Sequence, residues 1–168
     1  MLVLRATKKL MDRIGPPSPD EVEPATTLLG QWYATVLFWK PQVALFVNEA
    51  TLLPVLGPLA PATTLLDRFP QQLAAVLAAH ETPQTIIDHE LDQMREYRLA
   101  KTANRSVVGI MNEFTHLAEV YRADMPAPDL HALSMRLATT PCSPLYKRHV
   151  RPDHELAALL RSSSSLES

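Results

Sequence analysis

The chain has 168 residues, of which 46% are hydrophobic and 20% charged, and its formal net charge at pH 7 is −2. This composition is typical of one soluble globular domain with enough apolar material for a core. The chain has no run of about 18 apolar residues, which argues against a membrane span. A single cysteine, Cys142, excludes an internal disulfide framework. The N-terminus lacks the features of a secretory signal, and we therefore expect a cytoplasmic protein without a membrane partner.

The first segments predict a strand, a short helix and a loop. Residues 2–7 alternate between the two faces of a strand. Residues 8–14 are compatible with a short helix. Residues 15–24 combine prolines, a glycine and acidic residues, which indicates a loop.

The next segments predict a β-hairpin. Residues 32–39 and 43–50 are rich in aromatic and β-branched side chains and are separated by a Lys-Pro-Gln turn. Residues 51–57 predict a third strand, in which Pro54 favours a sheet edge or a bulge.

The middle of the chain changes to helical spacing. Apolar residues recur at helical intervals over residues 62–79, and we expect Pro70 to kink or divide this helix. A Thr-Pro pair at 82–83 predicts the start of another helix, which ends near Met94. Residues 95–102 are compatible with a short strand or an extended connector.

Helices dominate the rest of the chain. Asn104 is expected to cap a long helix over residues 104–122, which the prolines of 125–128 end. Asp129 predicts the cap of a further helix, and Asp153 that of a last short one.

Early strands and late helices predict an α+β fold. We expect a small, mainly antiparallel sheet, made of the N-terminal strand and the hairpin and covered by four to five helices. Residues 1–161 are predicted to form a single domain, and the serine-rich residues 162–168 a disordered tail.

The segment 101–114, with the sequence KTANRSVVGIMNEF, holds more hydrogen-bonding side chains than a structural helix needs. A helix that starts at Asn104 offers free backbone N–H groups and a positive dipole, to which Lys101 and Arg105 add charge. The simpler interpretation is that Asn104 caps the helix, Ser106 supports the cap and Arg105 is solvated.

A helical wheel also groups polar residues farther along this helix. Arg105, Gly109, Asn112 and His116 fall within about 60° of one another, opposite the apolar face. A glycine within a helix costs about 1 kcal/mol relative to alanine, and its missing side chain leaves room for a backbone or a ligand.

The strands carry polar residues that an apolar sheet does not require. Arg5 and Thr7 share one face of the first strand, and Asn48 and Glu49 interrupt an apolar strand. A buried Arg5 needs a carboxylate partner, for which Glu49 is the natural candidate. Such a pair serves either the architecture alone or the wall of a site.

The leading hypothesis is therefore a polar groove at the start of the 104–122 helix that binds an anionic or polar ligand, with nucleic-acid phosphate as one option. The candidate ligand-binding residues are Arg5, Thr7, Asn48, Glu49, Lys101, Asn104, Arg105, Ser106 and Asn112. One alternative is a phosphoester-cleaving enzyme such as a nuclease, with Glu49 as base and Arg105 as transition-state clamp. Another is a regulatory or protein-interaction module, or a homo-oligomer, that exposes apolar residues between Leu52 and Leu59.

Other chemistries have weaker signals. The six histidines show no metal-ligand spacing, and no nucleotide or cofactor motif is present, so we expect neither a metal nor a cofactor. Cys142 is more typical of a turn cysteine than of a nucleophile. Stacking of nucleic-acid bases on Trp32, Tyr33 and Trp39 competes with core packing of the same rings.

Positive charge is unevenly distributed, so a near-neutral total is compatible with a basic face. Three basic groups stand out: Arg5, Lys8, Lys9 and Arg13; then Arg95, Arg98, Lys101 and Arg105; then Lys147, Arg148 and Arg151.

Three segments, MLVLRATKKL, WYATVLFWKPQVALFVNEATLLPV and KTANRSVVGIMNEF, resemble a bacterial family of uncharacterised proteins. That family shares an MLxLRxTxKL opening, an LFVxExTLLPV-like strand and an NRSVxGxMN-like helix, and the TPCSPL segment also fits its pattern. The resemblance implies no reaction. It matches the motif positions Arg5, Thr7, Lys9, Asn48, Glu49, Lys101, Asn104, Arg105, Ser106, Gly109 and Asn112. The chain departs from the pattern at Ala6, where the family pattern has cysteine, and this argues against cysteine chemistry there.

Overall fold

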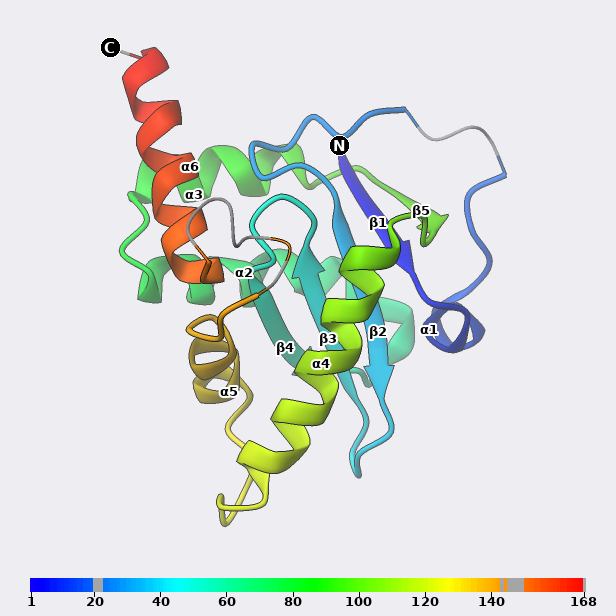
Figure 1. The fold of residues 1–168 in the computed structure, drawn as a ribbon. Helices are drawn as coiled ribbons and strands as arrows, with labels where there is room; N and C mark the ends of the chain where they lie inside the picture. Colours follow the sequence, from blue (N-terminus) through cyan, green and yellow to red (C-terminus); the bar gives the residue numbers. More distant parts are fainter. Residues whose placement is uncertain (20–22, 143, 145–149, 168) are drawn as a thin grey trace.

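The structure is a computed structural model that describes residues 1–19, 23–142, 144 and 150–167. Five strands form one sheet in the order β4-β3-β2-β1-β5 (Figure 1). The strands are β1 (Leu2–Ala6), β2 (Trp32–Leu37), β3 (Val43–Asn48), β4 (Pro54–Pro58) and β5 (Tyr97–Lys101).

Six α-helices are present in the described part of the chain, which is more than the four to five predicted. They are α1 (Lys8–Ile14), α2 (Leu65–Ala79, preceded by a 3-10 turn at Ala62–Thr64), α3 (Gln84–Gln93), α4 (Arg105–Arg122), α5 (Leu130–Leu137) and α6 (Pro152–Glu167). The prediction of an α+β fold is confirmed.

The sheet is mixed, so the prediction of a mainly antiparallel sheet is close but not exact. β2, β3 and β4 form an antiparallel meander, as the hairpin signals indicated. β1, however, runs parallel to both of its neighbours, β2 and β5. The parallel pairing with β5 joins segments about 95 residues apart in sequence, with Leu2 opposite Tyr97 and Ala6 opposite Lys101. Local patterns carry no information about such a pairing.

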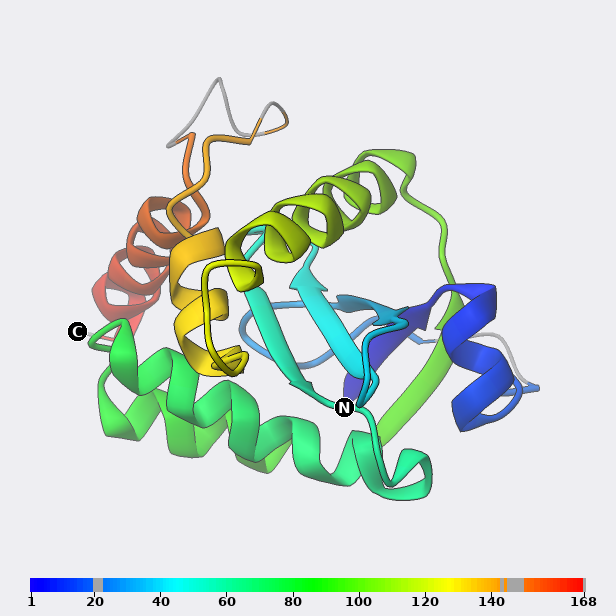
Figure 2. The same cartoon turned by 90° about the horizontal axis from the view of Figure 1, so that it is seen from below.

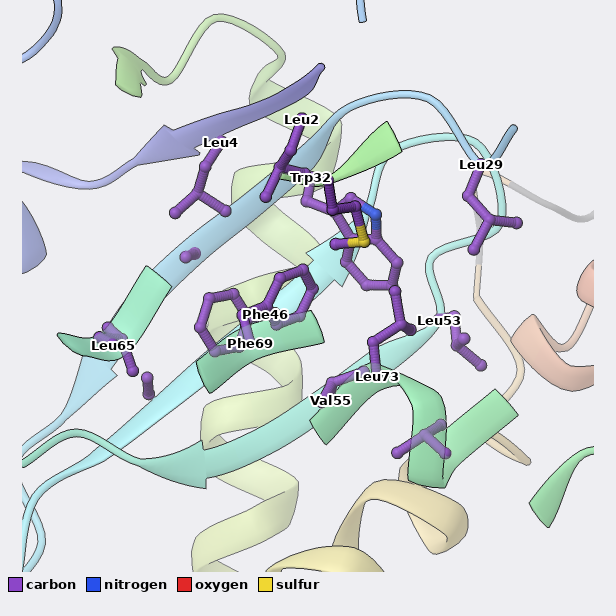
Figure 3. Packing of buried hydrophobic residues seen from close by; sticks show 14 of the residues in the cluster. Leu2, Leu4, Leu29, Trp32, Phe46, Leu53, Val55, Leu65, Phe69 and Leu73 are labelled. Carbon is purple, nitrogen blue, oxygen red and sulfur yellow. The ribbon is translucent and has the colours of Figure 1, made fainter. Parts of the chain in front are cut away.

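Helices cover both faces of the sheet (Figure 2). α1, α2 and α3 contribute to one apolar cluster with β1, and α4 and α5 to a second cluster on the opposite face. In the first cluster, Phe69 of α2 stacks on Phe46 with ring centroids 4.1 Å apart, and meets Trp32 edge-on at 5.2 Å (Figure 3). The helical spacing read from the sequence therefore directs α2 onto the sheet.

α2 continues through Pro70, which the sequence analysis expected to kink or divide it. Pro70 lies in the second turn, where the missing N–H removes one helical hydrogen bond. Burial of Leu65, Phe69 and Leu73 on one face of α2 favours the unbroken helix.

Both edges of the sheet are covered within the described chain. At β4, the Leu56 N–H donates to Ser134 Oγ of α5 at 2.8 Å. At β5, the Ser18 N–H donates to the Leu99 carbonyl at 2.8 Å, and the Leu99 N–H to Ser18 Oγ at 3.2 Å. These contacts protect edge groups that would otherwise pair with another strand.

The apolar residues around β4 are inside the protein. Leu52, Leu56 and Leu59 are each less than 5% exposed. The predicted exposed apolar patch between Leu52 and Leu59 is therefore wrong, because α2 and α5 pack against β4.

The C-terminal helix is longer than expected. α6 continues to Glu167, into the segment for which a disordered tail was predicted. The division of the chain into one domain and a tail stays a prediction. In the part of the chain that the structure describes, no helix is long and apolar enough to cross a bilayer.

Candidate functional site

A chain of polar side chains connects β1, β2 and the end of β3. Arg5 Nε donates to Gln31 Oε1 at 2.8 Å, and Gln31 Nε2 donates to Glu49 Oε2 at 2.7 Å. All three side chains are partly buried. Glu49 is thus the carboxylate associated with Arg5, as the sequence suggested, but Gln31 lies between them. An amide can join a cation and a carboxylate because it both accepts and donates.

The same network reaches the start of α4 through Tyr33. The Asn104 N–H donates to Tyr33 Oη at 2.9 Å. Burial raises the pKa of Tyr33, and the charge and hydrogen bonding of Glu49 raise it further, while the Asn104 N–H opposes the shift. Tyr33 is therefore a neutral phenol that ties the beginning of α4 to the sheet.

Asn104 caps α4, which confirms its predicted structural role. Its Oδ1 accepts the N–H groups of Ser106 at 2.9 Å and Val107 at 3.4 Å. The Arg105 side chain is exposed at the first position of the helix. The cap uses two of the free N–H groups of the first turn and leaves the positive end of the dipole facing solvent.

The topology explains why polar groups gather here. β1 and β5 are adjacent and parallel, but the helices that follow them pack on opposite faces of the sheet. α1 places Leu10 in the cluster with Leu4, whereas α4 places Val107 in the cluster with Tyr33. In open sheets, ligands bind outside the carboxyl ends of adjacent parallel strands whose following helices lie on opposite faces of the sheet.

A hollow of about 320 Å³ lies at this position, which we call the α4 hollow. Its lining residues are Thr102, Ala103, Asn104, Arg105 and Val108. Arg5 reaches its border, because Arg5 Nη1 donates to the Lys101 carbonyl at 2.9 Å.

The α4 hollow has a cationic border. Arg5 is only partly buried, and in the described chain its Nη2 group makes no protein hydrogen bond. Arg105, which lines the hollow, is exposed. Lys101 is also exposed, at the end of β5, but it pairs with Ala6 and so lies on the face of the sheet opposite Arg5. Guanidinium and ammonium groups beside a helix N-terminus favour an anion, and guanidinium binds phosphate or carboxylate with two parallel hydrogen bonds.

Asn48 does not reach this site. It pairs with Trp32 in the sheet and lies on the face opposite Arg5. It is fully buried, donates to the Leu29 carbonyl at 2.8 Å and accepts the Thr51 N–H at 2.9 Å. Its side chain shapes the turn between β3 and β4.

Thr7 and Asn112 lie outside the α4 hollow. Thr7 Oγ1 is 2.9 Å from Thr35 Oγ1, at the end of β1. Asn112 is two turns along α4, where it borders a separate hollow with Glu113, His116, Leu117, Thr140 and Pro141.

Gly109 is exposed on α4, as the helical wheel predicted. A Cβ atom built on it meets no atom within 4 Å. No described segment of the protein uses the space that the glycine leaves.

Gln31 and Tyr33 were missed as members of the site. Gln31 precedes β2 without a pattern around it, and its role depends on the parallel register of β1 and β2. Tyr33 lies opposite Arg5 in the same register, which only the folded sheet reveals; in the sequence, an aromatic residue in an apolar strand indicates core packing.

Glu90 is a buried carboxylate that the sequence analysis did not single out. Its two oxygens accept the N–H groups of Leu28 at 2.7 Å and Leu29 at 2.9 Å. Burial raises the pKa of Glu90, and these N–H groups oppose the rise. Glu90 fixes the loop before β2 and has no opening to solvent, which makes its role architectural.

Cys142 is a core residue. It is fully buried, and its Sγ donates to the Thr140 carbonyl at 3.3 Å. Burial raises the pKa of the Cys142 thiol to about 12, so the nucleophilic thiolate is disfavoured at neutral pH. Part of the TPCSPL segment around it lies outside the described residues.

Among the described residues, no three His, Cys, Asp or Glu side chains converge in a way that could hold a metal ion. The site is therefore best described by its cations, its amides and the start of α4.

A family model, Domain of unknown function (DUF6933), matches residues 3–155. The chain belongs to the DUF6933 family. The resemblance to an uncharacterised family is thereby confirmed, and the match covers all of the sheet except Leu2 of β1, together with the site described above. Comparisons with curated proteins and with solved structures find no match for this DUF6933 chain.

Proposed function

We propose that this DUF6933 protein binds an anionic ligand, through a phosphate or carboxylate group, in the α4 hollow. The proposal rests on one observation. Arg105 lines the hollow where α4 begins, Lys101 directly precedes the lining residues, and Arg5 comes from the distant β1 and donates to the Lys101 carbonyl. The positive end of the helix dipole and the cations both attract an anion.

The network behind the hollow supports this function by holding Arg5 in place. Its Nε and Nη1 groups are fixed by Gln31 and the Lys101 carbonyl, which directs the remaining donors. A pre-oriented donor loses less conformational entropy when a ligand binds.

Catalysis has less support. Cleavage of a phosphoester would need Glu49 as a free base beside Arg105. Glu49 instead accepts a hydrogen bond from Gln31, and it is not among the residues that line the α4 hollow. We therefore propose binding without catalysis.

Thermal unfolding with inorganic phosphate and with nucleoside phosphates, at low and at physiological ionic strength, tests the proposal. We expect phosphate compounds to raise the midpoint of the wild-type protein and of Arg95→Gln, because Arg95 is exposed away from the hollow and pairs with Asp92. The increase should disappear in Arg105→Gln. It should persist or grow in Glu49→Gln, because that substitution removes a negative charge near the site. Equal stabilisation of Arg105→Gln and Arg95→Gln would refute the proposed site.

A further inference from the structure

We propose that the anionic ligand is a single strand of nucleic acid, whose backbone follows the edge formed by the carboxyl ends of β5, β1 and β2. This inference rests on the proposed function and names the chemical class of its ligand. We call the surface the basic edge, and it consists of Arg105, Lys101, Arg5, Lys8, Lys9 and Phe38.

Sheet register brings two of the basic groups in the sequence together. Lys101 of β5 is opposite Ala6 of β1, and the chain continues from Ala6 to Lys8 and Lys9 in α1. Lys8, Lys9 and Lys101 are all exposed. The cations at the α4 hollow are therefore continuous with those at the start of α1.

The basic edge continues to an exposed aromatic ring. β2 is parallel to β1 and ends at Leu37, so Phe38 emerges at the same edge of the sheet. Phe38 is 57% exposed, and Lys9 Nζ lies 5.9 Å from its ring centroid. An exposed ring beside cations is the arrangement on which proteins stack unpaired bases.

The dimensions suit a short stretch of a strand. Lys101 of β5 and Ala34 of β2 are both at the level of Ala6, so Lys101 and Phe38 are separated by two strand spacings across the sheet, roughly 10 Å, and by four residues along β2, roughly 13 Å. The direct separation is about 16 Å, and since a stacked strand advances about 3.4 Å per nucleotide, about five nucleotides cover it. The exposed cations supply backbone contacts along it, and the ring at one end accepts a base.

Acidic side chains elsewhere on the surface disfavour binding of a polyanion outside the basic edge. Three acids, Asp67, Asp88 and Asp92, and one cation, Arg95, line a separate hollow of about 420 Å³ between α2 and α3. The acids outnumber the cation in this hollow, so a polyanion is less favoured there than at the basic edge.

The features of the surface favour nucleic acid over a membrane. Among the described large apolar side chains, the exposed ones are Phe38, Tyr97 and Val120. Tyr97 borders the acidic hollow, and Val120 lies near the end of α4, so a lipid surface would find one apolar anchor beside the lysines. The rings that the sequence analysis considered for stacking, Trp32, Tyr33 and Trp39, are at most 5% exposed and cannot accept a base.

Fluorescence anisotropy with a labelled oligothymidine or oligouridine tests the inference over a series of salt concentrations. We expect binding that weakens as salt increases, with a slope that Lys8→Gln/Lys9→Gln reduces by about 1.4, since each phosphate contact contributes about 0.7 for single strands. Phe38→Ala should weaken binding about tenfold through loss of stacking. Arg95→Gln, outside the basic edge, should bind as the wild type does. All four side chains are exposed, and urea unfolding confirms that each variant is folded.

The outcomes separate this inference from the proposed function. Phosphate stabilisation that depends on Arg105, combined with no oligonucleotide binding or with binding unaffected by the Lys8/Lys9 and Phe38 substitutions, overturns the inference alone. Loss of both responses overturns both. Tighter binding to a duplex of the same length, or to vesicles of anionic phospholipid, would also overturn the choice of a single strand.

Discussion

At the scale of single residues, Gln31 is the side chain on which the site depends most. It joins Arg5 of β1 to Glu49 at the end of β3, and each contact is shorter than 2.9 Å. The sequence suggested a direct pair between Arg5 and Glu49. The Gln31 amide bonds to both side chains, so Arg5 and Glu49 need no direct contact with each other. Part of the Arg5 guanidinium is therefore available to a ligand.

Gln31→Ala should lower the free energy of unfolding by about 1–3 kcal/mol, because it leaves Arg5 Nε and Glu49 Oε2 partly buried without this partner. Urea unfolding measures the change. Gln71→Ala is the matched control, since Gln71 is exposed on α2 and should change stability by less than about 0.5 kcal/mol. If the two variants are equally stable, the bridge contributes nothing to the fold.

Substitution of Gly109 is expected to stabilise the protein, in contrast to substitution of Gln31. It lies inside α4, and a Cβ atom placed there meets no atom within 4 Å. Gly109→Ala should therefore raise the free energy of unfolding by about 0.5–1 kcal/mol through helix propensity. Thermal or urea unfolding compares the variant with the wild type, and a destabilised Gly109→Ala would contradict this description of α4.

At the scale of elements, the start of α4 serves both the fold and the proposed site. Asn104 accepts two N–H groups of the first turn, while its own N–H binds Tyr33 of β2. The cap and the link to the sheet thus fix the position of Arg105, which the proposed anion would contact.

Asn104→Ala should destabilise the protein by about 1 kcal/mol, the usual cost of losing an N-cap. Asn104→Asp should keep most of the stability, because a carboxylate also accepts the N–H groups and complements the dipole. The aspartate should nevertheless weaken phosphate binding, since it adds a negative charge to the α4 hollow. Unfolding in urea, with and without phosphate, measures both effects. An Asn104→Asp variant that binds phosphate more tightly would contradict an anion site here.

Local sequence signals predicted several elements well. The hairpin of β2 and β3 follows its aromatic and β-branched residues, and Asn104 and Asp129 cap α4 and α5 as expected. Asp153 was expected to cap the last helix, but α6 begins at Pro152, so Asp153 lies within its first turn. β5 was left undecided, because it becomes a strand by pairing with β1, a contact that no local pattern encodes.

At the scale of the whole molecule, packing of the helices around His80 makes stability depend on pH. His80 ends α2 and faces Asp153 of α6 and His131 of α5. Burial, opposed by Asp153 and aided by His131, lowers the pKa of His80 below its ordinary value of 6.5. The unfolded chain therefore binds this proton more readily than the folded one. His80 contributes stability that is complete above about pH 6.5 and is lost as the pH falls.

The wild-type protein should consequently lose more stability than His80→Gln when the pH decreases from about 7.5 to about 5.5. Urea unfolding at several pH values measures both proteins. The raised pKa of Glu90 affects both alike, so it cancels in the comparison. A stability difference between the two proteins that is independent of pH would show that His80 has an unperturbed pKa in the fold.

The candidate site was predictable only in part. Helix-start chemistry pointed to Asn104 and Arg105, and an isolated arginine in a strand pointed to Arg5, which the structure brings to the same edge. The sequence could not indicate that Asn48 lies on the face of the sheet opposite Arg5. Both faces of β3 are buried, so its apolar pattern does not tell one face from the other. It also could not reveal Gln31, whose partners come from strands that meet only in the folded sheet.

Titration of ¹⁵N-labelled protein with inorganic phosphate, followed by amide chemical shifts, tests the central claim most directly. The account predicts saturable shifts that are largest at Thr102–Arg105 and Val108, the residues of the α4 hollow, and smaller ones at Arg5. Shifts that are absent, or that concentrate instead at the α2–α3 hollow around Asp88 and Asp92, would contradict it.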